Sequence, residues 1–323
     1  MKILKDCAED EITHAVQALI GGQLVAFPTE TVYGLGADAS NALAVSRVYE
    51  VKGRPKDHPL IVHISSLTQM ALWTSKIPDY ALELAKTFWP GPMTLILQKS
   101  SLAKDFITGR QNSIGLRIPS HPVALKLLSE FEDSGGKGIA APSANRFGCV
   151  SPTTAEAVIQ ELGGFLNESD LILDGDQCMV GIESSIIDCT RNIPLILRPG
   201  AITLEMIKDI IDLEVSQNRT TDHVRAPGMH ASHYAPKAKV VFGESIKEGD
   251  GLIAIAAIPT PPRVIRLASP NNYEEFARVL YKALREADSL ALERVSVIMP
   301  KGGGLATAIQ DRVKRASGSL KHL

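Results

Sequence analysis

The sequence predicts an α/β fold in two domains, and three observations support this prediction. Apolar runs typical of strands alternate with amphipathic segments typical of helices along most of the chain. A polar stretch between Glu214 and Lys237, broken by Pro227-Gly228, interrupts this alternation once. The length of 323 residues also suits two domains better than one. We expect a first domain at residues 1–213, a linker at 214–238 and a smaller second domain at 239–323.

The first domain begins with a helix and a strand, and this order then repeats. An amphipathic helix at Glu9–Ile20 is stopped by Gly21-Gly22 before a strand at 23–27. The interleaving predicts one large, twisted, mixed sheet with helices packed on it. Further strands are expected at 59–64, 93–98, 113–118, 171–174, 184–188 and 193–197, and further helices at 42–51, 79–88, 122–131, 154–162 and 203–211.

The second domain is predicted to be a compact α/β unit. Strands are expected at 239–242, 252–258, 264–267 and 295–299, and helices at 273–287 and 305–316. Lys301-Gly302-Gly303-Gly304 lies between the last strand and the last helix, and it is interpreted as a tight turn because a lone glycine turn is weak evidence for a phosphate site.

Composition narrows the class of protein. The chain is 45% hydrophobic and 22% charged, as in an ordinary globular enzyme, and its net charge of -2 provides no global attraction for nucleic acid. The four cysteines have no C-x-x-C spacing, so neither a zinc knuckle nor a disulfide framework is indicated. The N-terminal residues have no apolar signal core, and no run approaches the roughly 20 apolar residues of a membrane span. These features predict a cytoplasmic protein.

A first group of polar residues follows the strand at 23–27. In Pro28-Thr29-Glu30-Thr31-Val32-Tyr33-Gly34-Leu35-Gly36, the side chains of Thr29, Thr31 and Tyr33 can donate hydrogen bonds to a substrate while the glycines allow close approach. The alternative is a tight turn that only redirects the chain.

A basic loop, Lys52 to Leu60, precedes the next strand. Its lysines and Arg54 are held between prolines, which suits binding of phosphates or carboxylates, although exposed lysines commonly serve solvation alone. His63 follows on the strand, where packing and ligand binding are both open readings.

Two arginines lie inside apolar strands. Burying Arg117 or Arg198 without a partner would be costly, so each implies an anionic group nearby. That group is either a ligand or an internal acid. Together with Arg54 they make three sequestered arginines, which favours a polyanionic ligand over three separate internal pairs.

Small and polar residues meet again in Ile139-Ala140-Ala141-Pro142-Ser143-Ala144-Asn145. Ser143, Asn145 and Ser151 suit ribose or phosphate oxygens. Alternatively, Ser151 or Thr153 caps the following helix. The sequence has no P-loop, no G-x-S-x-G elbow and no H-E-x-x-H motif, which disfavours a P-loop NTPase, a serine hydrolase and a zinc protease.

Taken together, several segments resemble the threonylcarbamoyl-AMP synthase, or YrdC-like, family in order and spacing. The match covers Glu9 to Ile211, and APGMHASHYAP with the following α/β unit resembles the longer, two-domain branch. The segments are PTETVYGLG, KGRPKDHPLIVH, WPGPMTLIL, GLRIPSHP, APSANRFGCVSPT, GIESSIID and LRPG.

The resemblance implies a basic cavity on a twisted YrdC-like sheet, beside a Rossmann-like second domain. There, ATP, L-threonine and bicarbonate give threonylcarbamoyl-AMP and pyrophosphate. Mg²⁺ accompanies ATP without a direct protein ligand. The product goes to a tRNA threonylcarbamoyl transferase that modifies the adenosine next to the anticodon.

The resemblance also implies residue roles. L-Threonine is expected at Thr31, His63, Arg117, Ala141 and Ser184; ATP is expected at Arg54, His58, Ser113, Ser143, Ser151, Arg198 and Tyr234; Lys52 and Asn145 are expected near the phosphates. Lys52, Arg54, Arg117 and Arg198 would act electrostatically, because carbamate attack on the ATP α-phosphorus requires no protein nucleophile.

Two further hypotheses concern the linker and other functions. His233-Tyr234-Ala235-Pro236 could close over the site as a lid, whereas Tyr234 could instead be an interdomain packing residue.

An RNA-binding module is the alternative function, disfavoured by the net charge and by the lack of interleaved aromatic residues. A carbamoyl-transfer enzyme of the hydrogenase-maturation type is disfavoured by the absence of its zinc-finger cysteines.

Overall fold

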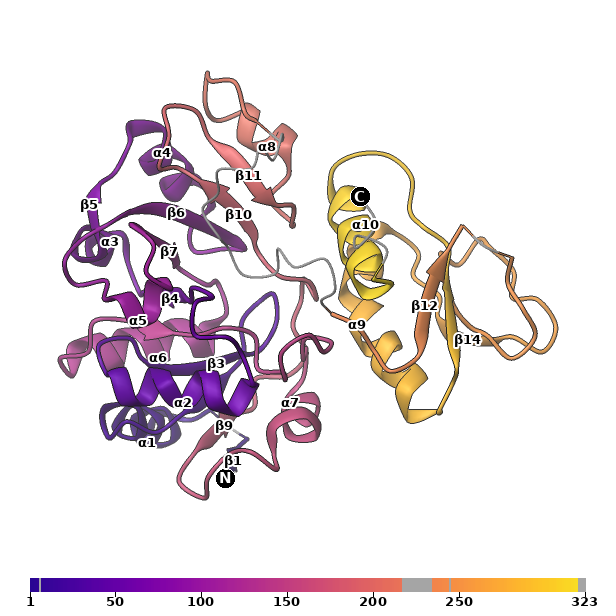
Figure 1. The fold of residues 1–323 in the computed structure, drawn as a ribbon, viewed down its shortest axis with the longest axis horizontal. Coiled ribbons are helices and arrows are strands. Elements are labelled where there is room, and N and C mark those ends of the chain that lie inside the picture. Colours follow the sequence, from indigo (N-terminus) through magenta and orange to yellow (C-terminus); the bar gives the residue numbers. More distant parts are fainter. Residues whose placement is uncertain (6, 217–233, 244, 319–323) are drawn as a thin grey trace.

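The computed structural model describes the chain except residues 6, 217–233, 244 and 319–323. Most of the predicted linker, including His233, therefore lies outside the described residues. Figure 1 shows a large α/β part, which contains the N-terminus, and a smaller α/β part beside it, drawn from orange to yellow.

The described strands of the larger part form one mixed, 11-stranded sheet, as the sequence predicts. Its order is β1-β9-β2-β3-β8-β4-β7-β6-β10-β11, with β5 also beside β6. β4 runs parallel to β7, whereas β6 and β7 are antiparallel. The strands are β1 (Lys2–Leu4), β2 (Val25–Phe27), β3 (Gly34–Asp38), β4 (Ile61–His63), β5 (Thr74–Lys76), β6 (Met93–Lys99), β7 (Ser113–Arg117), β8 (Ile139–Ala140), β9 (Leu171–Leu173), β10 (Ser185–Asp188) and β11 (Leu195–Arg198).

Two apolar clusters form because side chains alternate along each strand. Val25 and Phe27 of β2 belong to a cluster with residues of α1 and α6, whereas Ala26 belongs to a cluster with residues of α2. The helices are α1 (Glu9–Ile20), α2 (Ala42–Lys52), α3 (Leu67–Trp73), α4 (Asp79–Phe88), α5 (Asp105–Thr108), α6 (Pro122–Asp133), α7 (Ala155–Leu162) and α8 (Leu204–Lys208).

The segment interpreted as a glycine-rich ligand loop or turn contains a strand. β3 pairs antiparallel with β2, and Gly36 lies opposite Val25. A Cβ atom on Gly36 would lie 2.8 Å from Ile139 Cγ2 and 2.9 Å from the Phe27 ring. Gly36 therefore serves packing, and the sequence pattern missed this strand because two of its five residues are glycines.

The predicted cap of α7 is wrong by one or more residues. Thr154 is the N-cap, and its side chain accepts a hydrogen bond from the backbone N–H of Ala157. Neither Thr153 nor Ser151 holds this position, because Ser151 donates its hydroxyl to Glu183. Ser151 is thereby available for a role at the site.

The second sheet is parallel, with the order β12-β15-β13-β14. Two helices belong to it, and Figure 1 shows both on the side that faces the larger part. The turn at 301–304 connects β15 to α10, as predicted. The elements are β12 (Lys239–Phe242), β13 (Gly251–Ile253), β14 (Ile265–Ala268), α9 (Tyr273–Ser289), β15 (Arg294–Val297) and α10 (Leu305–Ala316).

The apolar run at 252–258 is only partly a strand. β13 ends at Ile253, and the guanidinium of Arg266 donates to the carbonyls of Ala254, Ile255 and Ile258. The arginine thus replaces strand neighbours as the hydrogen-bond partner of this apolar backbone.

Within the described residues, no helix combines the length and the apolar character that crossing a membrane requires.

Gly36→Ala is expected to destabilise the larger domain by about 1–3 kcal/mol, because the added methyl overpacks a site bounded partly by backbone. The Val25 carbonyl oxygen lies 3.0 Å from the position of the new Cβ. Urea unfolding measures the change. Gly164→Ala is the matched control, since no atom lies within 4 Å of its added Cβ; equal stability losses in both variants would contradict the packing role of Gly36.

Candidate active site

A cavity of about 50 Å³ brings together residues from distant parts of the chain. This volume is smaller than the roughly 300 Å³ at which small-molecule sites begin. Most of the residues expected to bind L-threonine or ATP line it. These are Thr31, Arg54, His63, Arg117, Ala141, Ser143, Ser184, Arg198 and Tyr234.

Three arginines and one carboxylate are the charged residues among the described lining of this cavity. The side chains of Arg54 and Arg198 both donate hydrogen bonds to oxygens of the protein. Arg54 Nη2 donates to the Pro59 carbonyl at 3.0 Å, and Arg198 donates to the carbonyl and the hydroxyl of Ser184 at 2.9 and 3.1 Å. Burial lowers the pKa of Arg54 to about 10, a value at which it remains charged at neutral pH. The cavity therefore favours an anion.

Arg117 has the internal acid that sequence reasoning left open. Its Nη2 lies 2.6 Å from Glu30 Oε1, and both side chains are buried. Arg117 Nε is buried without a hydrogen-bond partner among the described residues. Arg117 is thus both an internally paired arginine and a lining residue with a donor to spare.

His63 lines the cavity as a neutral imidazole. Burial, and then the neighbouring Arg117, lowers its pKa to about 3. Its ring packs edge-on against Phe27, and its Nδ1 has no hydrogen-bond partner within the described part of the chain. His63 thus packs against Phe27 and lines the cavity, and its role in ligand binding stays a prediction.

The residues after β2 divide between the turn and the cavity. Thr29 Oγ1 donates to the Val32 carbonyl at 2.7 Å and contacts Thr31 Oγ1 at 2.9 Å. The Tyr33 hydroxyl donates to the Asp176 carbonyl at 2.9 Å. Thr29 therefore holds the turn, as the tight-turn reading predicts, whereas Tyr33 ties this segment to the loop after β9. Both residues also line the cavity.

Five predicted site residues are outside the cavity lining. Lys52 Nζ donates to the carbonyls of Ser143 and Asn145, so it supports the loop that carries Ser143. Burial, and then Arg54, holds the pKa of Lys52 well below its ordinary value. Asn145 Oδ1 is buried without a partner in the described ranges. The five are Lys52, His58, Ser113, Asn145 and Ser151.

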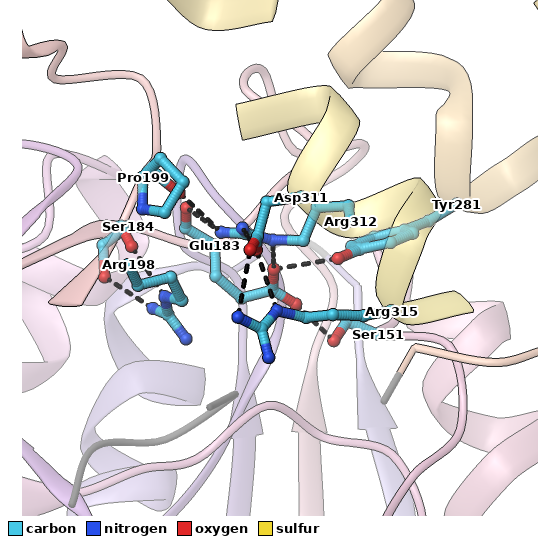
Figure 2. A network of polar contacts seen from close by, with 9 residues as sticks. All are labelled: Ser151, Glu183, Ser184, Arg198, Pro199, Tyr281, Asp311, Arg312 and Arg315. Carbon is cyan, nitrogen blue, oxygen red and sulfur yellow. Dashed lines mark hydrogen bonds and ion pairs between the residues drawn. The ribbon is translucent and has the colours of Figure 1, made fainter. Parts of the chain in front are cut away.

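Glu183 is a lining residue to which the sequence analysis assigned no role. Its carboxylate accepts hydrogen bonds from Ser151 at 2.6 Å, from Tyr281 of α9 at 2.8 Å and from Arg312 Nε of α10 at 2.8 Å (Figure 2). The only sequence signal was an acid between apolar and serine residues in GIESS. Arg312, the cation that pairs with Glu183, belongs to the other domain. No pattern in the sequence around Glu183 could reveal this pair.

Tyr234 lines the cavity and also packs between the domains. Its ring lies 5.7 Å from that of Tyr281, and the Arg312 guanidinium lies 5.4 Å from its centroid. The interdomain packing reading therefore applies, and the lid hypothesis stays a prediction.

The mixed sheet, the second α/β domain and a cavity with excess buried positive charge define an α/β enzyme that acts on an anionic substrate. Residues 17–200 match the family described as "Telomere recombination", which groups Sua5, YciO and YrdC. Residues 202–318 match "Threonylcarbamoyl-AMP synthase, C-terminal domain". The chain belongs to the threonylcarbamoyl-AMP synthase family, in its two-domain branch.

Similar proteins agree over nearly the whole chain. The threonylcarbamoyl-AMP synthase of Pyrococcus abyssi is 40% identical over 92% of this chain and 91% of its own. The threonylcarbamoyl-AMP synthase of Bacillus subtilis is 36% identical over 96% of this chain and 94% of its own. The crystal structure of P. abyssi Sua5 complexed with L-threonine superposes with a TM-score of 0.88 at 37% identity, covering 98% of each chain.

His63→Leu is expected to weaken the acid sensitivity of the fold. Because the folded pKa of His63 is about 3, the unfolded chain takes up this proton first as pH falls below 6.5. The wild type therefore loses about 2 kcal/mol between pH 7 and pH 5 through this residue, and the variant does not. Urea unfolding at both pH values measures this difference. If both proteins lost the same free energy of unfolding between pH 7 and pH 5, the pKa of His63 in the folded protein would lie near its ordinary value.

Proposed function

We propose that this chain condenses L-threonine, bicarbonate and ATP into threonylcarbamoyl-AMP and pyrophosphate in the cavity described above. The observation that carries the proposal is the gathering of Arg54, Arg117 and Arg198 around one cavity. Relatives that share nearly the full length of this chain are named for this product, and one was solved with L-threonine. The reaction serves threonylcarbamoyl transfer to tRNA, by a separate transferase, in the cytoplasm.

The proposed chemistry needs no protein nucleophile. The neutral amine of threonine forms an N–C bond with carbon dioxide or bicarbonate, releasing a proton or water. A carbamate oxygen then attacks the α-phosphorus of ATP, and the bond to the β-phosphate oxygen breaks to release pyrophosphate. The wall would contribute by holding three reactants together and by offsetting phosphoryl charge.

Threonine would bind near Arg117, because that guanidinium retains an unpartnered Nε for a carboxylate. Neutral His63 can accept a hydrogen bond from the substrate amine through Nδ1, which avoids a second cation beside Arg117. Thr31, Ala141 and Ser184 complete this proposed subsite.

ATP would bind near Arg54 and Arg198, because both guanidinium groups line the cavity and guanidinium groups bind phosphates well. His58, Ser113, Ser143, Ser151 and Tyr234 are the other residues proposed for ATP. Lys52 and Asn145 would act by fixing the loop at 143–145, since the Lys52 ammonium holds two of its carbonyls.

Mg²⁺ would accompany ATP and neutralise part of its charge. The described residues contain no group of three or more His, Cys, Asp or Glu side chains arranged for a metal ion. The ion would be held by phosphate oxygens and water, as Mg²⁺ commonly is in nucleotide sites.

The proposal is tested by pyrophosphate release from ATP, with L-threonine and bicarbonate omitted in turn. Release that needs both, together with threonylcarbamoyl-AMP detected by mass spectrometry, is the expected result. Release indifferent to threonine would contradict the proposed reaction, and RNA binding that survives saturating ATP would favour a nucleic-acid-binding role.

Arg54→Ala is expected to lower kcat/KM by about 100-fold or more, because a preorganised cation facing the phosphates is lost. Thermal unfolding by circular dichroism checks that the fold persists. Arg263→Ala, at an exposed arginine of the second domain paired with Glu248, is the control and should keep wild-type turnover. A folded Arg54→Ala protein with near-normal activity would rule out this role.

A further inference from the structure

A buried guanidinium of the second domain contacts a residue that lines the cavity of the first. Arg312 of α10 is fully buried, and its Nε donates to the Glu183 carboxylate at 2.8 Å (Figure 2). Its Nη2 donates to the backbone carbonyls of Glu183 at 3.3 Å and Pro199 at 3.1 Å. One side chain thus ties together the segments that precede β10 and follow β11.

Each tied segment carries a residue of the proposed site. Glu183 accepts a hydrogen bond from the Ser151 hydroxyl and precedes Ser184, whereas Pro199 follows Arg198 directly. Arg198 in turn donates to Ser184, which closes the arrangement. Displacing Arg312 would therefore loosen several lining groups at once.

The backbone around Glu183 is also held closely against the second domain. Gly181 has a φ of 80°, and a Cβ atom there would lie 2.4 Å from the Cα of Arg278 in α9. Such close contact leaves the segment little freedom to shift. The contact between the domains therefore transmits the position of α9 and α10 to the cavity wall.

Arg312 also offsets the buried negative charge of Glu183. Arg198 and Arg312 both face Glu183, and the acid also contacts the hydroxyls of Ser151 and Tyr281. A buried carboxylate without its guanidinium partner is strongly disfavoured and tends to take up a proton. A protonated Glu183 could donate a hydrogen bond to Ser151 instead of accepting one from it, and the Ser151 hydroxyl would then take another orientation.

We propose that Arg312 is a positioning residue of the active site, which holds Glu183, and through it Ser151, Ser184 and Arg198, in the geometry that binds ATP. The second domain is then part of the catalytic cavity and more than an anchor for the linker. This inference rests on the proposed function, because it assigns the positioned groups to ATP.

The test compares Arg312→Gln with wild type in the full-length chain. We expect the Kd and the KM for ATP to rise by about tenfold or more, as for other partners that orient binding groups, with a smaller change in the KM for threonine. ATP binding by equilibrium dialysis gives this readout without turnover. Arg312→Lys should recover part of the loss, because it keeps the charge but lacks the planar fork that reaches four oxygens, those of the Glu183 carboxylate and carbonyl, the Pro199 carbonyl and the Asp311 carboxylate.

The pH profile separates positioning from a loss of packing. Burial raises the pKa of Glu183, and Arg312 followed by Arg198 lowers it below its ordinary value. Tyr281, Tyr234, Asp311 and Arg315 complete the titratable surroundings. Arg312→Gln should therefore add an acid-side loss of kcat/KM that wild type lacks. The double variant Arg312→Gln/Glu183→Gln should lack that loss while keeping weak ATP binding.

Arg278→Gln is the matched control, since Arg278 also crosses between the domains but, among the described residues, donates to the Met179 carbonyl alone, at 2.9 Å. It should keep wild-type ATP binding. Wild-type constants and pH profile in folded Arg312→Gln, or equal losses in both variants, would overturn the proposal. If wild type itself neither binds ATP nor releases pyrophosphate with threonine, the proposed function fails first and this inference falls with it.

Discussion

Buried positive charge is the constraint on which the rest of this structure depends. Each cation at the cavity must lose water, so each needs oxygen partners from the protein before a substrate arrives. Arg54 donates to the carbonyl of Pro59, and Lys52, which lies outside the cavity lining, donates to the carbonyls of Ser143 and Asn145. These partners belong to the loops of the site, so satisfying the cations also fixes the loops.

The kind of partner decides what charge remains for a ligand. A carbonyl or hydroxyl oxygen satisfies a guanidinium N–H without cancelling its charge, whereas a carboxylate does both. Arg54 donates to a carbonyl oxygen, whereas Arg117 is paired with the carboxylate of Glu30. The side of the cavity at Arg54 is therefore suited to phosphates and the side at Arg117 to a zwitterion, in agreement with the two substrates proposed for it.

The two domains share one polar interior at their contact. Glu183 from the larger domain is neutralised by Arg312 from the smaller one, and Tyr234 packs against Tyr281 and Arg312. Buried ion pairs of this kind often add little stability compared with apolar packing, but they tolerate few alternative geometries. A contact of this kind therefore fixes the position of one domain against the other. A cavity that must hold three reactants in one geometry requires such a fixed wall.

The sequence by itself determined the fold class, most elements and nine of the residues that line the cavity. Periodicity and strand-end motifs are local, so α4 and α10 were predicted with the observed bounds and the arginines were recognised as sequestered. Short strands such as β8, and the glycine-rich β3, lack a periodic signal, and they form because they pair with neighbouring strands.

Only the tertiary structure could show that Lys52 supports a loop, that Glu30 pairs with Arg117 and that Arg312 completes the wall. Those contacts join residues 87 to 129 positions apart, and no local pattern encodes which buried charge will meet which partner.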